Sequence, residues 1–338
     1  MDTATGSSVR SRSWLWRGSA LVVAIYVVAV LALMWWWDHA PPHFDVTAAA
    51  QSRAAARGQS VVTGSVTTTA LIVSAETLLD KRGGYLSNDR FPPGVLMDNV
   101  PNWEFGVLTA TRDLAREMRN KFARSQSQSE EDADLKEADP LFSSPNDRWL
   151  LPSSENQYRK AIAHVDGYLL RLGKNDPNGA QFYARADNLA DYLDLVSNRL
   201  GSLSQRLSAS AGQLRLEGDA PVDAGTTPAP TQTPQIVRTP WTKIDDIFYE
   251  SRGYTWALLE QLQAIEVDFG PTLQRKSAVV SLKQIIRELE EAQKPLHSPI
   301  VLNGSPFGFF ANHSLVMANY ISRANAAVID LRELLKRG

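Results

Sequence analysis

Three carboxylates stand close together in one stretch without helical periodicity, "KRGGYLSNDRFPPGVLMDNVPNWEFG" (residues 81–106). They belong to Asp89, Asp98 and Glu104. Neighbouring carboxyl groups can divide the roles of general acid and general base when their surroundings separate their pKa values. An Asp beside Gly, Asn or Pro is also the ordinary composition of a turn, in which the carboxylate accepts hydrogen bonds from the backbone. The turn interpretation needs no further residues, so we assign no catalytic residue here.

The histidines and cysteines add little chemistry. His39 and His43 flank an apolar segment, whereas His164, His297 and His313 are scattered, and no His-Glu-x-x-His arrangement occurs. The chain has no cysteine, which excludes a disulfide, a thiolate nucleophile and Cys-ligated zinc. Its formal net charge of −2 gives no electrostatic case for nucleic acid. The sequence therefore predicts no metal, no cofactor and no nucleic-acid partner.

Two long loops are the best candidates for a binding site. The connection 83–101 is longer than compact domains usually need, and its apolar residues indicate that it is ordered. The stretch 294–314, "KPLHSPIVLNGSPFGFFANHS", has the same character, and each loop leads into a helix. One hypothesis is that both loops form a single polar, aromatic-lined groove with two helix N-termini, and the alternative is two separate caps over a helical bundle. The candidate binding residues are Tyr85, Asn88, Asp89, Arg90, Asp98, Asn99, Trp103, Asn303, Asn312 and His313.

The strongest signal is the run "GSALVVAIYVVAVLALMWWW" at residues 18–37, which contains no charge. A helix of this length rises about 30 Å, the thickness of the hydrocarbon core of a bilayer. Tryptophans stand at both of its ends, as in an interfacial aromatic belt, and three arginines precede it. A cleaved signal peptide would have a shorter apolar core, followed closely by small residues. We therefore predict an uncleaved anchor in the bilayer, with a cytoplasmic N-terminus and the rest of the chain in the periplasm.

The remaining sequence predicts an all-α protein, because no segment shows sustained period-two alternation. Helices are expected over about 61–82, 102–124, 154–174, 177–207 and 240–268, from Pro271 onward, and from 313 to the end. Five of them begin at or just after a residue that can cap a helix N-terminus: Asn102, Ser154, Asp176, Thr239 and Asn312. The predicted divisions are a cytoplasmic tail (1–17), the transmembrane helix (18–37), a juxtamembrane segment (38–60), a first bundle part (61–216), a flexible Pro/Thr-rich linker (217–238) and a second bundle part (239–338).

One predicted helix carries a heptad seam over residues 182–207. Its apolar residues, spaced alternately by four and three, are Phe182, Ala186, Leu189, Leu193, Val196, Leu200, Leu203 and Leu207. Such a seam suits a coiled coil between subunits, and hence a homo-oligomer. It equally suits a long helix packed within its own bundle, and the wide apolar face given by Tyr192 and Leu195 favours that interpretation.

The stretches 81–106 and 302–335, together with "RSQSQSEEDADL", "QFYARADNL" and "RLGSLSQRLSAS", resemble the blocks of an uncharacterised proteobacterial family of single-pass membrane proteins, catalogued only as a domain of unknown function. The resemblance covers nearly the whole chain apart from its N-terminal tail and the linker. It implies a Gram-negative inner-membrane protein, and it carries no known activity or catalytic residue.

Two functional hypotheses follow. The first is a membrane-anchored interaction or scaffold protein that binds an envelope protein through helical faces and the two loops. The second is a periplasmic enzyme acting on a cell-wall or lipid substrate through loops 83–101 and 294–314. The helical stripes favour the first, and the density of Asn, Asp and Trp in the loops is the feature that favours the second.

Overall fold

The computed structural model describes residues 7–125, 130–174, 176, 179–215, 235–237, 239–298, 300–305 and 308–337. As predicted, the fold is all-α. The α-helices within these ranges are α1 (Ser7–Trp37), α2 (Val46–Ala55), α3 (Ser65–Asp80), α4 (Asn99–Glu117), α5 (Ala133–Phe142), α6 (Ser154–Leu172), α7 (Ala186–Ser208), α8 (Ile244–Asp268), α9 (Gly270–Arg275), α10 (Val279–Ala292) and α11 (His313–Lys336). A π-helical turn, Met118–Phe122, extends α4, and the three-residue strands β1 (Gln213–Arg215) and β2 (Gln235–Val237) pair antiparallel. The predicted linker 217–238 lies largely outside the described residues.

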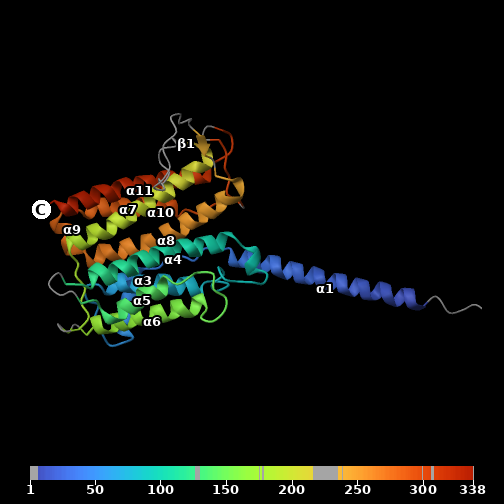
Figure 1. The fold of residues 1–338 in the computed structure, drawn as a ribbon, viewed down its shortest axis with the longest axis horizontal. Helices are drawn as coiled ribbons and strands as arrows, with labels where there is room; N and C mark the ends of the chain where they lie inside the picture. Colours follow the sequence, from blue (N-terminus) through green and yellow to red (C-terminus); the bar gives the residue numbers. More distant parts are fainter. Residues whose placement is uncertain are drawn as a thin grey trace, which may run out of the picture.

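The long helices lie side by side along one direction, and α1 leaves one end of this bundle almost along the same direction (Figure 1). One hydrophobic core joins the segments before and after the linker, with α4 packed on α8 and α7 packed on α11.

Two glycines permit the close contact of α4 with α8. A Cβ atom on Gly253 would lie 1.9 Å from the carbonyl oxygen of Trp103, and one on Gly106 would lie 2.1 Å from that of Glu250. Only a residue without a side chain fits such an approach.

The heptad seam lies inside this core. Leu189, Leu193, Val196, Leu200, Leu203 and Leu207 are all buried within a single chain. Because α11 of the same chain packs along α7, the seam presents no free face to a second copy. The packing of α7 on α11 therefore supports the interpretation of a long helix within its own bundle, and a homo-oligomer through 182–207 stays a prediction.

The start of α7 differs from the prediction. The helix begins at Ala186 rather than near Asp176, because the preceding segment is extended and bound elsewhere. The backbone amide of Tyr183 donates to the carbonyl of Phe122 (2.6 Å), and the Asn188 side chain donates to the carbonyls of Lys121 (3.1 Å) and Tyr183 (2.9 Å). These bonds hold the chain against the end of the π-helical turn instead of letting it coil.

Several other helix starts also differ from the sequence prediction. Asp98 rather than Asn102 caps α4, Ser153 rather than Ser154 caps α6, and α8 follows a 3-10 turn at Trp241–Lys243. The helix predicted from Pro271 is divided into α9 and α10. The prediction for Asn312 is confirmed: its side chain accepts a hydrogen bond from the amide of Leu315 (2.9 Å) at the start of α11.

Two helices were not predicted. The segment 38–60, taken as juxtamembrane, contains α2, which Asp45 caps. The acidic stretch after residue 129 contains α5, capped by Asp132. Arg171 on α6 donates to the carboxylates of both Asp132 (2.7 Å) and Asp134 (2.6 Å). Charges that resemble a solvated surface in the sequence are therefore paired between α5 and α6.

Candidate functional site

The end of the bundle from which α1 leaves, here called the near end, gathers both candidate loops. Its described residues are 81–98, 143–153, 239–243, 293–298, 300–305 and 308–312 (Figure 1). The indole of Trp37 packs so closely on Gly83 that a Cβ atom there would lie 2.7 Å from the ring. Arg252 on α8 donates to the carbonyls of Gln293 (3.0 Å) and Lys294 (2.9 Å), which ties the α10–α11 connection to the same end.

Glu104 is the residue that orders the first loop. Its carboxylate is fully buried and accepts hydrogen bonds from the amides of Leu86 and Ser87 (2.8 Å each), from the Ser87 hydroxyl and from the ammonium group of Lys81. Charge-assisted bonds of this kind are strong because the surroundings are poor in water. The Glu104 carboxylate already accepts four hydrogen bonds that hold the loop, so it is not free to act as a general base.

Three loop residues pack the first loop against the α5–α6 connection. The buried Tyr85 donates its hydroxyl hydrogen to the carbonyl of Asn146 (2.8 Å). The Asn88 amide, also buried, donates to the carbonyl of Arg148 and to Glu155 Oε2 (2.8 Å each). Arg90 is exposed and donates to the carbonyl of Asp147 (3.3 Å). Asn88, which we expected among the ligand-binding residues, is therefore a buried structural residue, and Arg90 remains accessible.

Asp89 and Asp98 have different surroundings. Burial raises the pKa of the Asp89 carboxyl above its ordinary value, and the nearby charges of Glu104 and Glu155 raise it further. Asp98 is exposed and accepts a hydrogen bond from the amide of Asn99 (2.9 Å) as the cap of α4. With Glu104 committed to the loop backbone, the three carboxylates act as anchor, loop residue and cap, which agrees with the turn interpretation.

Trp103 belongs to the core rather than to a binding surface. Its side chain is buried between α4 and α8, and its ring lies 5.4 Å from that of Trp256. Asn99 begins α4 and borders a small cavity of about 30 Å³, together with Trp37 and Tyr249.

The second loop is closed by a short polar network. Asn312 is buried and donates to Asn303 Oδ1 and to the carbonyl of Gly304 (2.8 Å each), while Asn303 donates to the carbonyl of Ser210 (3.1 Å). His313 Nδ1 accepts from the amide of Leu302 (2.9 Å), which fixes the tautomer of the ring, and burial lowers its pKa. These residues hold the loop to the start of α11.

The two loops border different cavities. A cavity of about 450 Å³ is lined by Leu296, His297 and His313 of the second loop together with Phe248, Arg252 and Tyr320. The small cavity beside Asn99 is also lined by Arg252, but by no residue of the second loop. Neither cavity is lined by both loops, so these two correspond to separate caps rather than to one groove.

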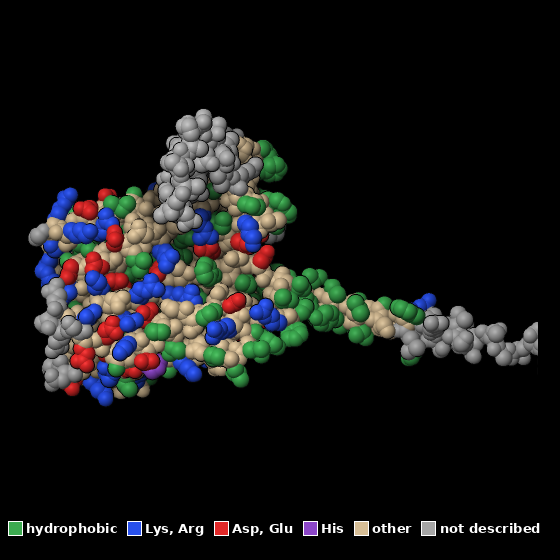
Figure 2. Space-filling view, in the orientation of Figure 1, with side chains coloured by type: hydrophobic (Ala, Val, Ile, Leu, Met, Phe, Trp, Pro, Cys, Tyr) green, Lys and Arg blue, Asp and Glu red, His purple; other side chains and the backbone are tan. Residues whose placement is uncertain are grey.

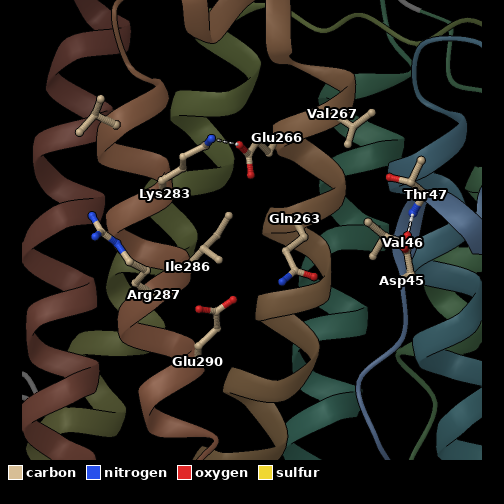
Figure 3. A pocket seen from close by; sticks show the side chains of 11 residues that line it. Asp45, Val46, Thr47, Gln263, Glu266, Val267, Lys283, Ile286, Arg287 and Glu290 are labelled. Atoms are coloured by element: carbon tan, nitrogen blue, oxygen red, sulfur yellow. Dashed lines mark hydrogen bonds and ion pairs between the residues drawn. The ribbon is translucent and has the colours of Figure 1, made fainter.

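An open groove along the side of the bundle was not found from the sequence. This side groove, about 820 Å³, lies between α10 and the start of α2, with α8 as its floor (Figure 3). Its apolar residues include Val46, Val267 and Ile286, and Lys283 pairs with Glu266 across it (3.5 Å). Its lining combines α8 and α10 with α2, which lies far from both in the sequence, so no local motif could have indicated it. Among the described residues, no group of three or more His, Asp or Glu side chains is placed to hold a metal ion.

The fold and these sites define a class: an all-α bundle preceded by one helix, Trp16–Trp37, that is long and apolar enough to cross a membrane. Over residues 9–338 the chain matches the family described as an uncharacterized protein conserved in bacteria (DUF2333). The protein therefore belongs to this bacterial family, as the resemblance implied. No curated protein and no solved structure matches the chain.

Proposed function

We propose that the protein is a single-pass anchor of the bacterial inner membrane whose periplasmic helical bundle acts as an interaction or scaffold module for an envelope protein. The observation that carries this proposal is α1. The side chains described along its apolar stretch are almost all exposed, although water is a poor solvent for twenty consecutive uncharged residues. A soluble core helix with this composition would be buried, so a bilayer accounts for both its composition and its exposure.

The charges on either side of the apolar segment support the orientation. Arg10, Arg12 and Arg17 precede it, and Asp38 follows it. Under the positive-inside rule the arginines stay in the cytoplasm and the bundle is exported. A reporter that is active only in the periplasm should work when fused after Gly338 and should be silent at the N-terminus. The reverse pattern would contradict the orientation.

The polar groups of the two loops support an interaction role over an enzymatic one. Glu104, Asn312 and His313 bind backbone atoms of the two loops, and Asn88 binds the carbonyl of Arg148 in the α5–α6 connection, so their chemistry is used in holding shape. The side groove offers what a partner helix requires, because apolar residues on all three helices (Val46, Val267, Val280 and Ile286) lie among charged ones.

The interaction can be tested by photo-cross-linking in intact cells. A photoreactive residue at Arg287, which is exposed on the edge of the side groove, should give a discrete cross-linked species. The matched control is the same residue at Lys160, which is exposed on α6 and not among the groove residues. Equal cross-linking from both positions, or none from Arg287, would contradict a binding role for the groove.

A further inference from the structure

The near end displays an unusual set of exposed aromatic and aliphatic side chains. Within the part of the bundle that the structure describes, the exposed Phe and Trp side chains all belong to this end or to the first turns of α4. We call the following set the apolar rim: Phe91, Val95, Leu96, Trp149, Leu150, Leu151, Trp241, Ile300, Phe309 and Phe310. Hydrophobic atoms gather on this end in Figure 2, next to the base of α1.

The exposure of the rim is large. Leu151 is 88%, Trp241 is 83% and Phe309 is 97% exposed. The rim comes from four separate chain segments. Two of these segments meet at Phe91 and Trp149, whose ring centroids lie 6.3 Å apart. Soluble surfaces rarely carry such sets of large apolar side chains without a partner.

The same end carries the membrane helix, and little separates the two. Trp37, the last residue of α1, packs on Gly83, and His39, Ala40 and Pro41 line the small cavity beside Asn99 and Trp103. The bundle therefore begins at the residue where the apolar span ends. A bilayer that holds α1 must come close to the rim, because no spacer keeps it away.

Part of the chain even reaches alongside the apolar span. Val30 is only 8% exposed, whereas Val27 and Val28, one turn or less before it, are 46% and 66% exposed. A side chain on an isolated helix would be as open as its neighbours, so another segment covers α1 at this level. The bundle consequently overlaps the depth of the span.

Basic residues accompany the rim. Arg82, Arg90 and Arg148 are exposed in the same loops. Aromatic side chains with arginines beside them are typical of surfaces that enter the headgroup region, where the rings reach the acyl boundary and the cations meet lipid phosphates.

We infer that the apolar rim is a lipid-docking surface: it enters the periplasmic leaflet around α1 and fixes the bundle upright on the membrane. This inference rests on the proposed anchoring by α1. The anchor alone would leave the bundle free to tilt, whereas insertion of loops from several sides of α1 would hold its orientation and keep the side groove away from the bilayer.

The natural absence of cysteine makes the test direct. Single cysteines replace Phe309, Leu151, Val28 on α1, or Val280, which is exposed at the opposite end of α10. Each full-length variant is labelled with an environment-sensitive fluorophore and reconstituted into phosphatidylethanolamine–phosphatidylglycerol vesicles with or without doxyl-labelled lipid. The labels at Phe309, Leu151 and Val28 should lose emission to the doxyl lipid, and the label at Val280 should not.

The other outcomes separate the two claims. If Val28 is quenched while Phe309 and Leu151 stay open to aqueous iodide, α1 is an anchor and the rim does not dock on lipid. If the rim labels respond to neither quencher, a protein surface covers them, and lipid docking is again wrong. If Val28 itself is not quenched by doxyl lipid, the anchor fails and both proposals fall together.

Discussion

The two ends of the bundle differ in the side chains that their connections expose. At the near end, loops are held by buried polar groups, such as Glu104 and Asn88, and large apolar side chains face outward. At the far end, buried polar groups also hold connections: Asn188 donates to the carbonyl of Lys121 (3.1 Å), and Asp268 accepts from the amides of Gly64 (2.8 Å) and Thr67 (2.7 Å). The outer side chains there form ion pairs instead, such as the exposed Lys121 with Asp191 (2.7 Å) and the partly exposed Arg119 with Glu131 (3.0 Å). The charged side chains at the end opposite α1 are visible in Figure 2.

The difference between the two ends shows how a loop can expose apolar side chains and still keep its shape. Exposed ion pairs give little stability and need water around them. A loop whose backbone is fixed from inside needs no polar surface of its own, so its outer side chains are available for contact with lipid. The near end thus combines an inner polar anchor with an outer apolar face.

The largest expected effect breaks the inner anchor of the near end. Glu104→Ala removes the partner of the buried Lys81 and leaves two loop amides without an acceptor. Removing one partner of a buried pair costs about 3–5 kcal/mol. Thermal unfolding of the full-length protein in detergent should show this loss.

The matched change at the far end is Asp191→Ala. It opens the exposed pair with Lys121 and should cost less than about 1 kcal/mol. Equal losses from the two variants would show that the buried carboxylate of Glu104 stabilises the fold no more than an exposed ion pair does.

A smaller effect sharpens the comparison within one loop. Asn88→Ala removes two buried hydrogen bonds, one to the carbonyl of Arg148, which keeps the amide of Ser154 as a donor (3.1 Å), and one to the Glu155 carboxylate, at about 1–3 kcal/mol. Arg90→Ala, two residues away and exposed, should stay within about 0.5 kcal/mol. Chemical denaturation of both variants measures the difference, and a harmless Asn88→Ala would show that the loop is not held from inside.

The smallest effect concerns Glu117 at the far end of α4. Burial raises the pKa of its carboxyl from 4.5 to about 7, and Asp191 adds to the rise while Lys121 opposes it. The folded state therefore holds a proton that the unfolded state releases, so stability falls as the pH rises from about 4.5 through 7. The loss should be about 1–2 kcal/mol, after allowance for screening by water.

Glu117→Gln serves as the comparison, since the amide cannot titrate. The difference in unfolding free energy between wild type and this variant should change from pH 5 to pH 8, with wild type losing more. A constant difference would show that the carboxyl titrates normally.

The sequence was informative where a pattern is local. The helix over 18–37 follows from an uncharged run of sufficient length, the start of α11 from its cap at Asn312, and the buried face of α7 from its heptad periodicity. The start of α7 could not be predicted, because the bonds of Tyr183 and Asn188 reach residues far away in the chain. Helix α5 was not predicted because its charges resemble those of a solvated segment. Their partner, Arg171, is distant in the sequence, and the structure shows that it pairs with Asp132 and Asp134.

The candidate site was predicted only in part. The described residues of both loops lie at one end of the bundle, and Arg90 and Asp98 are accessible. The roles of Asn88, Trp103 and Glu104 depend on what surrounds them, and residue type alone does not show whether a polar side chain faces a ligand or its own backbone. The apolar rim and the side groove each combine segments distant in sequence, which a local pattern does not reveal.

Membrane anchoring by α1 is the central claim, and the mature N-terminus tests it most directly. The protein is isolated from washed bacterial membranes, and its intact mass and N-terminal peptide are determined. We predict a chain that retains residues 18–37 and stays with the membranes after an alkaline carbonate wash. A soluble form that begins after Trp37 would contradict the account, because α1 would then be a cleaved signal sequence and the apolar rim would have no bilayer beside it.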